Sequence, residues 1–307
     1  MLFINKYIKL FFIRILFIFS FSTPSFAAND ELAANEGTSK GAPPSIGNFA
    51  LRTSQQPGPL ISLGQNIIDA NQVLLTLATV SPFPNGGAFD IVNATLNYGF
   101  TDYTSLYFNY PLRADTAFNS HRSLRFLDVS LQIEHAFYAA GNNKFQDQAT
   151  IVGGLTLPTH ENSSIDKIDG FGAPSYFLGT TFNRTYVDWY LFASPGAVIT
   201  TRSDNIKIGS QILYQAGVGH NIFSVKNKAM LFALLEFDGQ YTQKNNLGGF
   251  IDYDSGGNVI SLTPSISFNT NHTMTQIGIG FPVVQNLNGD QDKINYFIAA
   301  NFTWTIT

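Results

Sequence analysis

The sequence predicts an all-β fold, a transmembrane antiparallel up-and-down β-barrel of twelve strands. Twelve stretches of about 10 to 15 residues alternate apolar and polar side chains at every second position, as strands with two different faces do. The connections between these stretches alternate between short turns and longer polar loops. The chain stops on INYFIAANFTWTIT (294–307), an aromatic strand that no proline, bulge or inward charge protects at an edge. This last strand must therefore be paired on both sides.

The composition differs from that of a soluble globular protein, whose whole surface faces water. Of the 307 residues, 12% are charged and 14% are aromatic, whereas roughly a quarter of the residues in a soluble globular protein are charged. The formal net charge is −4 and no basic patch is present, so the sequence predicts no nucleic-acid partner. There is no cysteine, which excludes a disulfide framework and a thiol nucleophile.

Residues 1–27 are predicted to be a secretory signal peptide. Three positive residues precede an apolar run at 15–21, and Ser25-Phe26-Ala27 supplies a small-x-small end. An uncleaved anchor is the alternative, although the run is short for a span. Residues 28–59 are rich in Asn, Ala, Gly, Pro and Ser without a period, and we expect a flexible periplasmic arm or plug there. The barrel is expected to occupy residues 60–307.

The predicted strands follow from the alternation, element by element. The first lies near 70–80; the second, FDIVNATLNYGF at 89–100, places Val92, Ala94, Leu96, Tyr98 and Phe100 on one face. The remaining ten lie near 104–112, 127–137, 145–157, 171–183, 186–199, 206–222, 231–241, 260–268, 277–283 and 294–307.

The connections give the predicted barrel two different rims. Short turns fall near 101–103, 141–144, 184–185, 224–227 and 271, and longer loops fall near 81–88, 114–123, 158–170, 200–205, 242–258 and 285–292. An even strand count with short periplasmic turns and longer outside loops is typical of outer-membrane barrels. In lipid every backbone polar group must be paired within the protein, so such strands must close. The prediction is a bilayer-embedded protein of a Gram-negative outer membrane. A secreted sandwich or β-solenoid, the alternative, would need a second sheet to cover the apolar faces.

Three segments carry a family resemblance. GFPVVQNLNGDQDKINYFIAANFTW (280–304), SLGQNIIDANQ (62–72) and YGFTDYTSLYFNYPL (98–112) resemble the outer-membrane transporter-like family named after the meta pathway of phenol degradation. The resemblance implies a barrel that moves small, often aromatic or apolar, compounds, and it supplies no catalytic residues. The last strand also resembles the C-terminal signal read by the barrel-assembly machinery, which is then an expected partner, although the chain ends on Thr307 and not on an aromatic residue.

Selectivity in a barrel depends on the side chains that face inward. The polar positions predicted to line a pore are Asn97, Asn109, Arg113, Asp128, Gln132, Glu134, Asp188, Gln211, Glu236, Asp238 and Gln276. Acidic groups outnumber the single arginine, so an open pore should prefer cations or neutral solutes over anions. The alternative is that these residues only fill the interior, as happens in eight-stranded barrels but not in sixteen-stranded ones.

Two prolines fall inside predicted neighbouring strands, where each removes a ladder hydrogen bond. Counted from a turn near 184–185, Pro174 and Pro195 are expected to stand opposite each other, with Gly196 beside them. One interpretation is a pair of bulges that aid curvature. The other is a lateral kink through which an apolar solute leaves the lumen for the membrane.

No catalytic site is predicted from the polar residues. The nearest pairing of histidine and serine is His220 with Ser224, which is expected beside a periplasmic turn and lacks an orienting third group. The run NLNGDQD (286–292) has oxygen ligands for Ca²⁺ but lacks the full loop pattern, so neither a metal nor a cofactor is predicted. The expected function is passive passage of small, apolar or aromatic molecules. A structural or adhesive surface protein with a closed lumen is the alternative.

Overall fold

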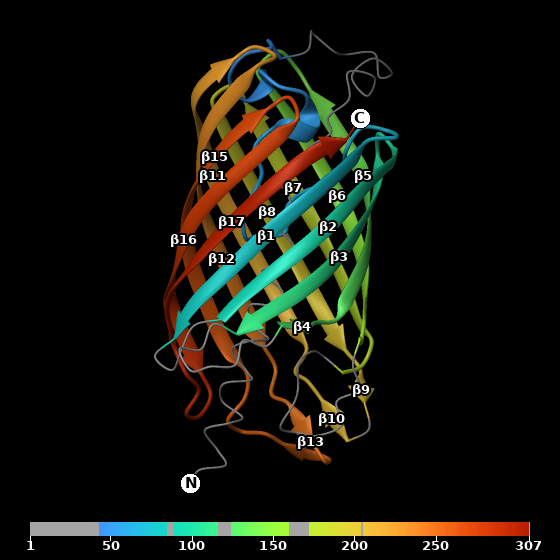
Figure 1. Ribbon diagram of the computed structural model, residues 1–307, viewed down its shortest axis with the longest axis vertical. Helices are drawn as coiled ribbons and strands as arrows, with labels where there is room; N and C mark the ends of the chain where they lie inside the picture. Colours follow the sequence, from blue (N-terminus) through green and yellow to red (C-terminus); the bar gives the residue numbers. More distant parts are fainter. Residues whose placement is uncertain (1–42, 85–88, 116–123, 160–171, 204, 307) are drawn as a thin grey trace.

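The computed structural model describes residues 43–84, 89–115, 124–159, 172–203 and 205–306 (Figure 1). The predicted signal peptide (1–27) and residues 28–42 of the predicted arm lie outside the described residues, as do parts of four predicted loops, at 85–88, 116–123, 160–171 and 204. Among the described residues, no helix is both long enough and apolar enough to cross a membrane.

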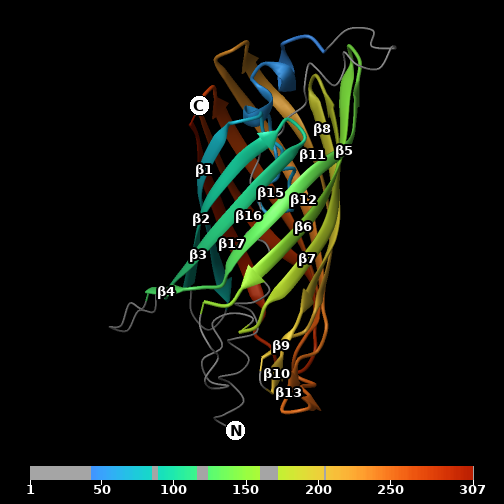
Figure 2. The ribbon, with the colours of Figure 1, turned by 90° about the vertical axis from the view of Figure 1, so that its right-hand side faces the viewer.

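Twelve long strands in the described residues form one closed antiparallel barrel (Figures 1 and 2), as predicted. Closure comes from the pairing of the last strand with the first, in which Val73 lies opposite Ile306. The strands are β1 (Val73–Pro84), β2 (Phe89–Thr101), β3 (Thr104–Asp115), β5 (Val129–Gly141), β6 (Phe145–Leu157), β7 (Ser175–Tyr186), β8 (Trp189–Thr200), β11 (Gln211–Val225), β12 (Ala229–Thr242), β15 (Gly257–Thr270), β16 (Thr273–Leu287) and β17 (Ile294–Ile306).

The two ends of the barrel differ. Turns of two or three residues, at 102–103, 142–144, 187–188, 226–228 and 271–272, join strands at what we call the short-turn rim. The opposite end, the long-loop rim, carries the short strands β4 (Leu124–Phe126), β9 (Arg202–Ser203), β10 (Ile206–Lys207), β13 (Asn246–Leu247) and β14 (Phe250–Ile251). The last four of these short strands form a small separate sheet.

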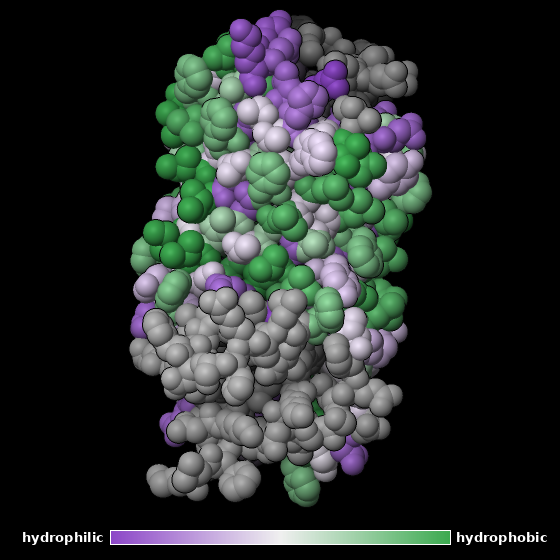
Figure 3. Space-filling model, viewed as in Figure 1, coloured by the Kyte–Doolittle hydropathy of each residue, from purple (hydrophilic) through white to green (hydrophobic). Residues whose placement is uncertain are grey.

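The outer wall is apolar because each strand turns one alternate face outward. On β17 the aromatic side chains of Phe302 and Trp304 are exposed, whereas Asn301 and Thr303 are buried inside. Ile294 is an exception to the predicted alternation and is buried, next to a register shift in the pairing of β1 with β17. Figure 3 shows apolar side chains across the middle of the visible face and hydrophilic ones at the upper end. This apolar belt is the surface that acyl chains cover in a membrane barrel.

Residues 43–72, which we call the lumen segment, occupy the inside of the barrel (Figure 1). The segment has two short 3₁₀ helices, η2 (Gly47–Phe49) and η3 (Thr53–Gln55), and no strand. Ile46 at its start is exposed, but its apolar residues from Ala50 to Ile68, including Leu60, are almost fully buried. The domain boundary predicted at residue 60 therefore falls within a continuous buried segment, and the first barrel strand begins at Val73.

Candidate functional site

The lumen segment enters the barrel at the short-turn rim. The backbone N–H of Gly47 donates to the Ser224 hydroxyl at 3.0 Å, and the Asn48 amide donates to the carbonyl of Tyr186 at 3.1 Å. Gly47 has φ +58, and a Cβ there would lie 2.0 Å from the carbonyl oxygen of Val187. Only glycine fits this close approach.

The segment leaves the lumen at the same rim. The backbone N–H of Ala70 donates to the carboxylate of Asp102 at 2.9 Å, and that of Asn71 donates to the carbonyl of Gly99 at 2.8 Å. Asp102 lies in the turn between β2 and β3. The segment is therefore a loop that has both of its ends at the short-turn rim.

A carboxylate on β12 holds the deepest part of this loop. Glu236, with no exposed surface, accepts the N–H of Leu60 at 2.7 Å through Oε1. Its Oε2 accepts the N–H groups of Ile61 and Ser62 at 3.0 and 2.9 Å. Asp238, two residues further along β12, accepts the Ser62 hydroxyl. Because three successive backbone N–H groups converge on its two oxygens, Glu236 is the main polar attachment of the loop.

A second carboxylate holds the loop from the other side of the barrel. Glu134 on β5 accepts the N–H of Asn66 at 2.9 Å and the hydroxyl of Thr150 at 2.5 Å. Between the two attachments, the Gln215 side chain on β11 accepts the N–H of Leu63 at 2.9 Å. The loop thus crosses the bore between strands on nearly opposite sides of the barrel.

Apolar side chains fill the lumen on the long-loop side of this crossing. Leu60, Ile61 and Leu63 of the lumen segment pack there against side chains of the barrel wall and loops. The whole apolar cluster consists of Leu60, Ile61, Leu63, Val80, Ile91, Leu127, Val152, Phe177, Val198, Ile208, Leu213, Val259, Ile294, Phe297 and Ala299.

Polar side chains dominate the lumen on the short-turn side. Here the barrel donates to backbone carbonyls of the loop: Asn97 to Asn66 at 2.8 Å, and Gln276 to Gly58 at 3.3 Å. The other buried polar side chains include Ser105, Asn109, Gln132, Thr181, Asn183, Ser267, Asn269, Asn301 and Thr303. A small aromatic and aliphatic cluster of Tyr190, Phe192, Phe232 and Leu234 interrupts this polar lining.

Most of the residues predicted to line a pore lie inside the barrel. Asn97, Asn109, Asp128, Gln132, Glu134, Gln211, Glu236, Asp238 and Gln276 are all buried there. Arg113 is half-buried on the same face of β3 as Asn109, and Asp188 is exposed in the turn between β7 and β8. A role of these residues in permeation stays a prediction. Alternation could not identify the residues of the loop as part of the lumen, because the segment SLGQNIIDANQ has no two-residue period.

The two prolines do not face each other, so the predicted register is wrong at this point. Pro174 precedes β7, and its carbonyl accepts the N–H of Thr201 at 3.3 Å. The prediction failed because the turn centres on 187–188, a few residues beyond 184–185. Pro195 does lie in β8, and the β7–β8 pairing stops at Gly179 opposite Gly196 and resumes at residues 182 and 193.

Gly196 makes room for an aromatic ring in the lumen wall. A Cβ on Gly196 would lie 2.8 Å from the Phe177 ring, and one on Gly179 would lie 2.7 Å from it. Both distances are below ordinary van der Waals contact. The ring of Phe177 therefore lies over the glycine pair at the point where the β7–β8 ladder is interrupted. Whether a solute leaves sideways at this point stays a prediction.

The histidine and the serine that were considered as a catalytic pair, His220 and Ser224, have different partners. His220 points outward and lies against Trp189, with ring centroids 4.5 Å apart, whereas Ser224 accepts a hydrogen bond from Gly47. Within the described residues, no three His, Cys, Asp or Glu side chains gather in a way that could hold a metal ion. In the NLNGDQD run, Gly289 adopts φ +66 and the Asn288 side chain donates to the carbonyl of Ser255.

Comparison with known proteins supports the fold. No protein-family model matches the chain, and no curated protein sequence matches it. An outer membrane channel from Pseudomonas putida F1 shares the fold with a TM-score of 0.60 and 14% identity, over 78% of this chain and 97% of that one. The fold is that of a bacterial outer-membrane β-barrel. The NanC porin aligns over 75% of this chain and 100% of its own with 8% identity and a lower TM-score of 0.48. The closed barrel and its apolar belt place the chain in the bacterial outer membrane.

Proposed function

We propose that this protein is a passive outer-membrane channel for small apolar or aromatic molecules, and that it is not an enzyme. The observation that carries the proposal is the apolar cluster, because it places aliphatic and aromatic side chains in the long-loop half of the lumen, beside buried polar ones such as Asp128 and Gln211. Water-filled porins have polar interiors. An apolar lining instead favours apolar solutes, at about 25 cal/mol for each Å² removed from water. The likeness to a barrel described as an outer membrane channel supports the proposal.

The lumen segment would act as the closure of this channel. Leu60, Ile61 and Leu63 supply part of the apolar cluster, so the loop occupies the space that a solute needs. Passage then requires the loop to move toward the short-turn rim, which we take as periplasmic. Recognition of β17 by the barrel-assembly machinery is part of the same proposal.

A second candidate is a structural or adhesive surface protein with a permanently closed lumen. The observation that favours it is at the long-loop rim, where the small sheet exposes 81% of Phe250, and Tyr253 close by is also exposed. Exposed aromatic side chains at a loop tip are typical of contact surfaces.

Single-channel conductance in a planar bilayer separates the two candidates. The test compares the refolded chain with a variant that lacks residues 43–69, because a shorter deletion would leave Leu60, Ile61 and Ser62 on Glu236. We expect rare openings of the intact chain and steady conductance of the variant. The current should prefer cations, since Glu134, Glu236 and Asp238 would then face water. No conductance of either protein would contradict the channel and favour the surface protein.

Permeation in cells tests the solute class. We expect expression of the intact chain to raise the uptake of the apolar dye N-phenyl-1-naphthylamine several-fold and to leave periplasmic nitrocefin hydrolysis unchanged. Nitrocefin is the polar comparison, because the apolar part of the lumen offers its polar groups no partners and the carboxylates of the lumen repel its negative charge. Equal increases for both probes would show a non-selective pore.

A further inference from the structure

The outer wall carries a charged pair that the proposed function does not use. In the described residues of the twelve long strands, lysine or arginine occurs only at Arg113 and Arg184. Arg113 shares its strand face with the inward Asn109, but the side chain of Arg184 lies outside and is 45% exposed. A charge on the lipid side of a barrel is costly at the bilayer midplane and costs little near the interface. Arg184 is two residues from the end of β7 at the short-turn rim, so it lies at interface depth.

The guanidinium of Arg184 is held in a fixed orientation. Its Nε and Nη2 donate to the two carboxylate oxygens of Asp147 on β6, each at 2.6 Å. The central carbon of the guanidinium lies 4.5 Å from the centroid of the Phe145 ring. Arginine has five N–H donors in a planar fork, and Asp147 takes two of them. This planar geometry suits a phosphate, which arginine binds through paired hydrogen bonds.

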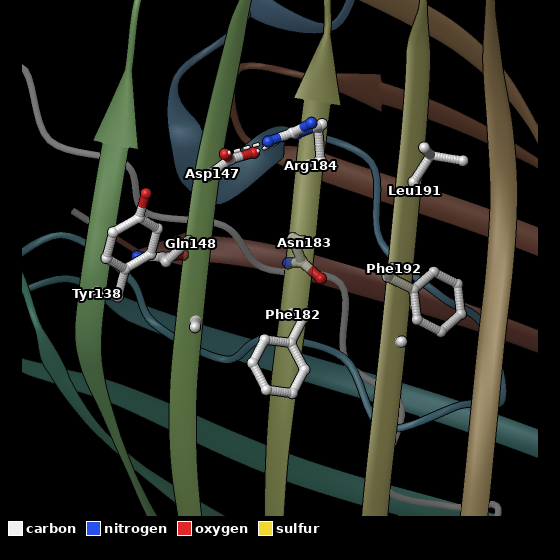
Figure 4. A pocket seen from close by; sticks show the side chains of 10 residues that line it. Tyr138, Asp147, Gln148, Phe182, Asn183, Arg184, Leu191 and Phe192 are labelled. Atoms are coloured by element: carbon white, nitrogen blue, oxygen red, sulfur yellow. Dashed lines mark hydrogen bonds and ion pairs between the residues drawn. The ribbon is translucent and has the colours of Figure 1, made fainter.

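Two adjoining cavities on the outer wall lie beside this pair. The first, of about 390 Å³, has Tyr138, Phe182 and Leu191 among its lining residues. Figure 4 shows Asp147 and Arg184 pointing toward each other above Phe182. The second, of about 490 Å³, is lined by Lys144, Trp189 and again Leu191. An apolar groove therefore runs from the lipid belt to a charged rim.

The charges around the two cavities balance. Arg184 and Asp147 line the first, and Lys144 and Asp188 line the second. Two positive and two negative side chains suit a ligand that is itself zwitterionic. Trp189 marks the depth of the lipid headgroups, where aromatic girdles of barrels lie.

We propose that this surface binds a zwitterionic glycerophospholipid with an ethanolamine headgroup. The phosphate lies between Arg184 and Lys144, the ammonium faces Asp188, and one acyl chain follows the groove past Leu191 and Phe182. An anionic lipid such as phosphatidylglycerol lacks the ammonium and would add a negative charge that Asp188 repels. The proposal depends on the membrane location of the barrel and not on its transport activity.

The two tryptophans of the chain, Trp189 and Trp304, provide a reporter and a matched control. Both are about half exposed on the outer wall, at 52% each, and both lie near the short-turn rim. The variant Trp304→Phe leaves only the reporter in the site, and Trp189→Phe leaves only a reporter on β17, far from the site. Each is reconstituted in vesicles with phosphatidylethanolamine or phosphatidylglycerol brominated near the glycerol end of its acyl chains.

We expect brominated phosphatidylethanolamine to quench the fluorescence of Trp189 more than brominated phosphatidylglycerol does. The difference should correspond to at least a threefold enrichment of phosphatidylethanolamine beside Trp189. Trp304 should show no preference. Adding Arg184→Gln and Lys144→Gln to the Trp304→Phe variant should abolish the preference at Trp189. Adding Lys226→Gln instead, in the turn between β11 and β12, should leave it intact.

Three results would overturn the assignment. The first is an equal preference for phosphatidylethanolamine at both tryptophans, and the second is a preference that survives the double substitution. The third is complete loss of the preference when soluble glycerophosphoethanolamine is added, which would mean that the ligand is a free phosphate ester. Heat-modifiable mobility on a gel verifies that each variant has folded. The Arg184 and Lys144 variants should conduct like the parent chain in planar bilayers, so a failure of the channel proposal and a failure of the lipid proposal give different results.

Discussion

The two halves of the lumen hold the same loop in different ways. On the short-turn side, barrel side chains bond to its backbone, as Asn97 does to Asn66. On the long-loop side, the side chains of Leu60, Ile61 and Leu63 pack in an apolar cluster, while their backbone N–H groups bond to Glu236 and Gln215. When the loop leaves, water can replace the hydrogen bonds at little cost, but the apolar surface gains nothing from water. In the proposed channel, an apolar solute is therefore a better replacement for the loop than water on the long-loop side of the lumen.

The largest change in the open fraction of the channel is expected from a substitution of Glu236, the carboxylate on β12 that holds the loop. In Glu236→Leu, the N–H groups of Leu60, Ile61 and Ser62 lose their acceptor in a buried position. Each orphaned donor costs about 1 to 3 kcal/mol, so the closed state should lose at least about 3 kcal/mol. We expect the open fraction in single-channel records to rise about a hundredfold or more. Asp188→Asn, in an exposed turn, is the matched control, and equal open fractions in the two variants would contradict the role of Glu236.

A smaller effect is expected in the apolar half. Leu60→Ala should destabilise the closed state by about 2 kcal/mol, near the low end for Leu to Ala, because the neighbouring apolar side chains can relax. The open fraction should rise by about thirtyfold, and benzene in the bath should reverse part of the rise by filling the cavity. Benzene should have no such effect on Glu236→Leu. Equal rescue of both variants would remove the distinction between the two halves.

The smallest effect is expected at the second carboxylate. Glu134→Gln keeps an oxygen that can accept the N–H of Asn66 and replaces the oxygen that accepts the Thr150 hydroxyl by an NH₂ group. We expect a change of about 1 kcal/mol, which is about a fivefold rise in the open fraction. An effect as large as that of Glu236→Leu would show that the two attachments are equivalent.

The barrel wall was predictable from the sequence because each strand residue has only two environments. Alternation alone identified the outward Phe302 and Trp304 and the inward Glu134, Glu236 and Asp238. The position of a turn is less constrained by this pattern. The prediction therefore placed Asp188 inside the barrel and Pro174 opposite Pro195, whereas Asp188 lies in a turn and the two prolines do not face each other.

The course of the loop was not predictable in the same way. Its conformation has no repeating hydrogen-bond pattern of its own, and its backbone partners lie on strands up to 218 residues away in the chain. The charged pair on the outer wall was also missed, since Asp147 and Arg184 are 37 residues apart and meet only through the register of β6 with β7.

The loop and β1 are one continuous chain, and both ends of the loop stay at one rim. No free end has to be threaded through the bore for the loop to come out or go back. The barrel can therefore empty and refill without unpairing β1 from β17. Because the loop remains tethered, its return is a unimolecular event with a high effective concentration. Reclosure should then follow first-order kinetics whatever the density of barrels in the membrane.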